Sequence, residues 1–120
     1  MSKTTREEDQ KIANLIAAPV LAYLKETDAT GHYQARLKHE REYYSGKHDR
    51  IITISQSNGR FLSNWFPKKI VQIRCRSYKS AGFYEYKPVT SDTHKISQEK
   101  LDALITQRNI VDILSEKHEI

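Results

Sequence analysis

The sequence predicts an α+β domain, in which an antiparallel sheet of about four strands is flanked by an N-terminal helix and a C-terminal helix or helices. Three observations predict it. Apolar residues recur at helical spacing near both ends of the chain, and apolar and polar residues alternate in the middle. Glycine-containing turn signals separate the alternating segments. A chain of 120 residues has the size of one domain, so we expect a single domain over residues 1–120.

The first predicted helix covers residues 5–26. Thr5 and Glu8 fit a capping box, in which the two side chains accept hydrogen bonds from unpaired amides of the first turn. The apolar residues that follow predict one buried stripe, made of Ile12, Leu15, Ile16, Val20 and Leu24. Pro19 lies inside this helix and removes a backbone donor, so we expect a kink or a division there.

Alternating and β-branched segments predict four strands, over residues 32–38, 50–56, 69–78 and 83–87. Residues 39–44 fit either a continuation of the first strand or a helical turn. Residues 45–49 predict a turn before the second strand, and residues 57–59 and 79–82 predict later turns.

Ser97 is the predicted N-cap of a helix over residues 97–107. Its apolar stripe does not continue into residues 110–114, so we expect a break near Arg108 and Asn109, followed by a short helix or an edge strand. A four-strand meander with the terminal helices on one side would leave the other face of the sheet in water.

The composition indicates a cytoplasmic protein. Cys75 is the single cysteine and has no partner for an internal disulfide, which favours a reducing compartment. The charged N-terminus differs from a signal peptide. The longest apolar run is interrupted by polar residues, so we expect no membrane partner. The sequence leaves the oligomeric state open.

The positive charge of the chain is concentrated in residues 67–87. Six basic side chains and one acidic side chain give this segment a charge of +5, equal to the net charge of the whole chain. Guanidinium groups pair with phosphate, and aromatic rings stack on unpaired bases. We therefore predict contact with single-stranded nucleic acid or RNA through a basic and aromatic sheet face that includes Lys68, Lys69, Arg74, Arg76, Tyr78, Lys79 and Lys87.

The register of the last hairpin has two alternatives. An even-numbered loop predicts three cross-strand pairs: Tyr78 with Phe83, Arg76 with Glu85 and Arg74 with Lys87. Tyr84 and Tyr86 would then face the core beside Cys75. An odd-numbered loop would place both tyrosines beside the arginines as an aromatic platform. The even register is slightly preferred, and the arginines face outward in both.

Two other classes of function stay open. A protein-binding accessory or inhibitor would use Phe61, Trp65 and Phe66 as its anchors, because aromatic residues dominate protein interfaces.

A small metal-independent ribonuclease or toxin would use histidines as its acid and base, with His32, His39 and His48 as the residues to test. Their spacing matches no catalytic motif, and the chain has neither a cysteine pair nor an HExxH motif. We therefore expect no catalytic activity, no metal and no cofactor.

Overall fold

The computed structural model describes residues 2–57, 67–78 and 82–115, with side chains for residues 6–57, 67–78 and 85–114. The elements, in order, are α1 (Ser2–Thr27), β1 (His32–Arg41), β2 (Lys47–Ser57), β3 (Lys68–Tyr78), β4 (Gly82–Thr90), α3 (Gln98–Leu104) and α4 (Gln107–Ser115). The predicted α+β class is confirmed.

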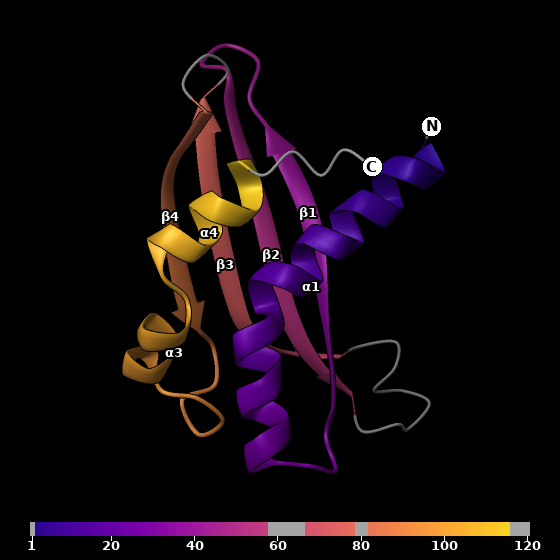
Figure 1. Cartoon of the computed structure of the whole chain (residues 1–120), viewed down its shortest axis with the longest axis vertical. Helices are drawn as coiled ribbons and strands as arrows, with labels where there is room; N and C mark the ends of the chain where they lie inside the picture. Colours follow the sequence, from indigo (N-terminus) through magenta and orange to yellow (C-terminus); the bar gives the residue numbers. More distant parts are fainter. Residues whose placement is uncertain (1, 58–66, 79–81, 116–120) are drawn as a thin grey trace.

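The four strands form one antiparallel sheet in the order β1-β2-β3-β4. Figure 1 shows that all three helices lie on the same side of this sheet. Helix α1 packs across β1 and β2, whereas α3 and α4 pack against β4 and α1. We call the side with the helices the helix face and the other side the outer face.

Helix α1 begins at Ser2 and runs to Thr27 without division. Thr5 therefore lies inside the helix and is not its N-cap, contrary to the prediction. Pro19 stands inside α1, and the helix axis bends in its middle (Figure 1), as expected where a backbone hydrogen bond is lost. Leu15 is also an exception to the predicted stripe. It is 41% exposed, because it lines a groove between α1 and α4.

The core lies between the sheet and the helices. Alternation along β3 puts Val71, Ile73 and Cys75 on the helix face, where all are buried as predicted. The β2 residues Ile52 and Ile54 oppose them and are also fully buried. The other buried core residues come from β1, the start of β3, and the helices and their connections: Ile12, Ala13, Ile16, Ala17, Val20, Leu24, Ala35, Ile70, Ile96, Leu101, Ile105 and Ile110.

The β1–β2 hairpin is tighter than the sequence predicts. Residues 39–41 continue β1, and β2 begins at Lys47, so His48 and Asp49 are strand residues and not part of a turn. The reversal is made by residues 42–46, where Gly46 has a φ of 70°, a conformation that glycine adopts without strain. This extension puts the polar ends of both strands within the sheet.

The β3–β4 hairpin has the even register over its described pairs from Glu85 onward. Arg76 pairs with Glu85, and the next pairs are Cys75 with Tyr86 and Arg74 with Lys87. Tyr86 packs against the core, as this register requires.

A bulge then shifts the β3–β4 register, so that Ser77 pairs with Phe83 and Tyr78 with Gly82. The predicted pair of Tyr78 with Phe83 is therefore wrong, because Tyr84 is an extra residue in β4. The side chain of Tyr84 lies outside the described residues.

The C-terminal region forms two short helices. The Ser97 side chain accepts a hydrogen bond from the backbone amide of Lys100 at 3.1 Å, which confirms the predicted N-cap. Helix α3 ends at Leu104, and α4 begins at Gln107, so the break lies a few residues before the predicted position. Of the two alternatives for the last segment, the short helix is the one observed.

Candidate functional site

Asp49 is a buried carboxylate on the outer face. Its side chain is 2% exposed and accepts hydrogen bonds from Arg76 Nε at 2.9 Å and Arg76 Nη2 at 3.2 Å. Arg74 Nη1 donates to the same carboxylate. The hydrogen bonds from Arg76, and then those from Arg74, lower the pKa of Asp49, although burial acts in the opposite direction. We call Asp49, Arg74 and Arg76 the Asp49 cluster.

Two exposed carboxylates complete the ion pairs of this cluster. Glu40 Oε1 lies 3.5 Å from Arg74 Nη1, and Glu85 Oε1 lies 3.5 Å from Arg76 Nη1. Each guanidinium group is therefore shared between a buried and an exposed acid. The charge of the two arginines is balanced in part within the protein, while the rigid contacts to Asp49 fix where the guanidinium groups lie.

A hollow of about 300 Å³ opens beside the Asp49 cluster. Its lining residues are Arg74, Arg76, Glu85, Tyr86 and Lys87. Lys87 is exposed and is the cross-strand partner of Arg74. The hollow thus brings three basic residues of the predicted site together around a space that can admit a phosphate group.

The other predicted site residues lie apart from this hollow. Lys68 and Lys69 are at the opposite end of β3, about 16 Å or more along the strand from Arg74. Lys68 forms an ion pair with Asp92, 2.6 Å away. Tyr78 is half-buried at the other end of β3, opposite Lys47. Lys79 lies outside the described residues.

The basic surface extends over strands that the sequence prediction did not include. By alternation, seven basic and three acidic residues of the described strands belong to the outer face, hence +4. The acidic ones are Glu40, Asp49 and Glu85, and the basic ones are Arg36, Lys38, Lys47, Lys69, Arg74, Arg76 and Lys87. Arg36 and Lys38 are exposed on β1, where their alternation with Ala35 and Leu37 predicted a half-buried strand, although neither was included in the predicted site.

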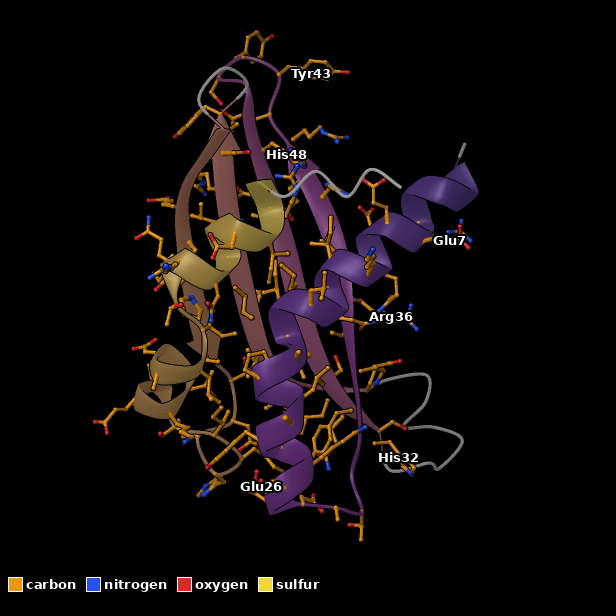
Figure 2. The ribbon with its side chains drawn as sticks, viewed as in Figure 1. Glu7, Glu26, His32, Arg36, Tyr43 and His48 are labelled. Carbon is orange, nitrogen blue, oxygen red and sulfur yellow. The ribbon has the colours of Figure 1, made fainter. Side chains whose placement is uncertain are left out.

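The aromatic platform of the alternative register does not form, because Tyr86 faces the helix side of the sheet. Among the described side chains, the most exposed rings are instead at the tip of the β1–β2 hairpin, where Tyr43 is 99% and Tyr44 is 102% exposed. Figure 2 shows Tyr43 at this tip and His48 close below it. A cavity of about 410 Å³ lies beside the tip, lined by Arg41, Glu42, Tyr43, Gly46, Lys47 and His48.

His39 and His48 form a chain of hydrogen bonds with Asp9 on the helix face. His39 Nε2 lies 2.9 Å from Asp9 Oδ2, and His39 Nδ1 lies 2.7 Å from His48 Nε2. The two imidazole rings are stacked, with centroids 4.9 Å apart. Three elements meet here, because Asp9 belongs to α1, His39 to β1 and His48 to β2. We call these three residues the Asp–His–His chain.

The Asp–His–His chain determines which ring nitrogen of each histidine carries a proton. A carboxylate only accepts hydrogen bonds, so His39 donates through Nε2–H and, when neutral, has its lone pair on Nδ1. That lone pair accepts the Nε2–H of His48, which leaves the lone pair of neutral His48 on Nδ1. Burial, and then the charges of Arg50 and Arg41, lower the pKa of His48 to about 4, so the ring is neutral near pH 7.

The sequence singled out His39 and His48 but gave no reason to join them. Both lie on one face, since His39 pairs with Arg50 and His48 with Arg41 in the same ladder. The available signal was the two-residue spacing of 39 and 41, and of 48 and 50, on either side of the reversal at residues 42–46. Asp9 had no signal in the strand pattern, because it comes from α1.

The remaining predicted residues are the three aromatic anchors and His32. Phe61, Trp65 and Phe66, the anchors of the protein-binding alternative, lie outside the described residues. His32 lies at the far end of β1 from the hairpin (Figure 2).

In the described part of the chain, no three His, Cys, Asp or Glu side chains are placed to hold a metal ion. No helix of that part is long and apolar enough to cross a membrane.

In comparisons of this chain with protein-family models, curated proteins and solved structures, none matched.

Proposed function

We propose that this protein binds single-stranded nucleic acid, RNA in particular, on the outer face of its sheet. The observation that carries the proposal is the hollow lined by Arg74, Arg76 and Lys87 on a face with a charge of +4. Phosphate groups accept hydrogen bonds from guanidinium and ammonium groups, and a nucleic acid whose phosphates are neutralised by such a surface releases its condensed counterions, which favours binding.

The Asp49 cluster affects both the entropy that is lost on binding and the salt dependence of binding. Its arginines are held in one geometry, so little side-chain entropy is lost when a phosphate contacts them. Their ion pairs with Asp49, Glu40 and Glu85 reduce the free charge, however. Most of the salt dependence therefore comes from the exposed residues Arg36, Lys38 and Lys87, of which Lys38 also lies 3.7 Å from Glu40 in an exposed ion pair.

Single-stranded ligands fit this surface better than a duplex. In the described part of the chain, the outer face is built of strands and carries no helix that could enter a major groove. The fully exposed rings of Tyr43 and Tyr44 at the edge of the face can stack on unpaired bases, which a duplex does not offer. Binding through phosphates and stacking gives only modest sequence preference.

The test is a fluorescence-anisotropy titration of a labelled single-stranded RNA at several salt concentrations. The variant replaces Arg36, Lys38 and Lys87 by Gln, which leaves the Asp49 cluster intact. Truncating Arg74 and Arg76 is a poorer test, since it would leave the buried Asp49 carboxylate without partners. We expect weaker binding, and a slope of log K against log salt that is shallower by about two.

The matched control replaces Lys11, Lys25 and Lys100 by Gln. It removes the same charge from exposed positions on α1 and α3. We expect this control to bind with nearly the wild-type salt slope. Equal losses in the two variants would show that only net charge matters, and no binding by the wild type at low salt would disprove the proposal.

A further inference from the structure

The geometry points to a second role for the β1–β2 hairpin: a site that cleaves single-stranded RNA by transesterification, with His48 as the catalytic base and acid. The Asp–His–His chain supplies proton transfer, and the neighbouring cavity supplies the space for a nucleotide. This inference rests on the proposed function, because the outer face delivers the substrate.

The Asp–His–His chain is arranged as a proton relay. His48 lines the cavity and, when neutral, has its lone pair on Nδ1, the nitrogen not bonded to His39. A proton taken up at Nδ1 makes the stacked imidazole pair cationic, and the Nε2–H of His48 can pass to His39 Nδ1. The positive charge then lies next to the Asp9 carboxylate, which stabilises it. His39 and Asp9 are therefore positioning residues.

The substrate can supply the nucleophile. The hydroxyls of Ser45 and Ser77 make other hydrogen bonds: Ser45 donates to Glu42, and Ser77 donates to the His48 backbone carbonyl. RNA carries its own nucleophile, the ribose 2′-hydroxyl, beside every phosphodiester. DNA lacks that group, so the chemistry of the site selects RNA.

The reaction balances with no other reactant. His48 Nδ1 takes the proton of the 2′-hydroxyl, and the O2′ electron pair forms a bond to phosphorus. The bond from phosphorus to O5′ breaks, its electron pair stays on O5′, and that oxygen takes the proton back from His48. The products are a 2′,3′-cyclic phosphate and a free 5′-hydroxyl. Arg41 and Lys47 line the same cavity and can stabilise the added charge on the phosphate oxygens. Lys47 also lies 3.6 Å from Glu42, an acidic residue of the same lining.

The substrate reaches this site from the outer face. His48 and Asp49 are consecutive residues whose side chains lie on opposite faces of β2, so the hairpin site and the Asp49 cluster share one end of the sheet. A strand bound at the hollow can pass around the hairpin tip. Tyr43 lines the cavity and is fully exposed, and its ring can stack on the base next to the scissile phosphate.

The experiment uses the full chain and two end-labelled oligonucleotides of one sequence, RNA and its 2′-O-methyl form. We expect the RNA to be cut to products with 2′,3′-cyclic phosphate ends, and the 2′-O-methyl form to stay intact. His48→Gln should lower the rate at least about 100-fold. The control His32→Gln, at the opposite end of β1, should keep the wild-type rate.

A pH profile separates proton transfer from a merely structural role. The charged groups around the histidine pair are Asp9 on α1, Arg41 on β1, Arg50 on β2, and Glu42 and Lys47, which line the cavity with His48. Asp49 acts on His48 from the opposite face of β2. The Asp9 carboxylate lies 2.9 Å from His39 Nε2, so Asp9→Asn removes the negative charge that stabilises the protonated pair. We expect Asp9→Asn to lower the rate and to move the acid limb of the profile to lower pH.

Three outcomes would overturn the inference: intact RNA with the wild type, equal cleavage by His48→Gln, or cleavage of the 2′-O-methyl form. If His48→Gln fails to fold, the Asp9→Asn profile decides, and an unchanged acid limb counts against the relay. Binding of the 2′-O-methyl form measured by anisotropy separates the two proposals. If it binds and RNA is not cut, the proposed function stands and the cleavage inference falls; if nothing binds, both fall.

Discussion

Asp49 and Arg76 are joined by two hydrogen bonds although they lie 27 residues apart in the sequence. They are Cα partners in the β2–β3 ladder, which places both side chains on the outer face. The arginine is thereby fixed over a carboxylate that is only 2% exposed. This contact stabilises the pairing of β2 with β3, and it also fixes the position of Arg76 on the basic surface.

Removing this carboxylate should destabilise the fold. Asp49→Asn leaves two guanidinium groups without their buried partner, and we expect the free energy of unfolding to fall by about 3 kcal/mol. Urea denaturation followed by circular dichroism measures it. Asp112→Asn, an exposed position on α4, is the control and should change stability by less than about 0.5 kcal/mol. A loss at Asp49 no larger than in the control would show that the cluster adds nothing to stability.

Asp28 should make the protein less stable in acid. Lys95 Nζ at 2.9 Å is the main cause that lowers its pKa to about 2, with help from Thr30 and Tyr33. The unfolded chain binds the proton near pH 4, so the contribution is present above pH 4 and is lost as the pH falls toward 2. Over this pH range, we expect the unfolding temperature of Asp28→Asn to fall less steeply than that of the wild type. An unchanged fall would contradict the assignment.

Cys75 should react slowly with thiol reagents in the native state. The side chain is 1% exposed, and burial raises the pKa of its thiol to about 12. We expect labelling in urea to be faster than native labelling by orders of magnitude. A cysteine at exposed Val89, in a chain where Cys75 is replaced by Ala, should label rapidly. Rapid native labelling of Cys75 itself would mean that the helices do not cover this face of β3.

Two leucines of α1 offer a matched comparison of buried and exposed packing. Leu24 is fully buried, whereas Leu15 is 41% exposed. We expect Leu24→Ala to cost about 3 kcal/mol of unfolding free energy, because it leaves a cavity in the core. Leu15→Ala should cost less than about 1 kcal/mol. The two values come from parallel denaturation curves, and a reversed order would show that α1 packs with its other side toward the sheet.

Local patterns in the sequence determined much of the secondary structure and the faces of β3. The Ser97 cap and the alternation of Val71, Ile73 and Cys75 depend only on neighbouring residues, so they could be read directly. The same alternation placed Arg74 and Arg76 outward. A period of two residues is a property of any extended strand, whatever it pairs with.

Contacts between distant segments were decided by the tertiary structure. The bulges at Ile70 and Tyr84 shift the register by one residue, and no local pattern marks them. The partners of Asp49 depend on the β2–β3 register, and the meeting of Asp9 with His39 depends on the angle at which α1 crosses β1. Registers and packing angles are selected by small differences in the free energy of the whole core, which no short stretch of sequence contains.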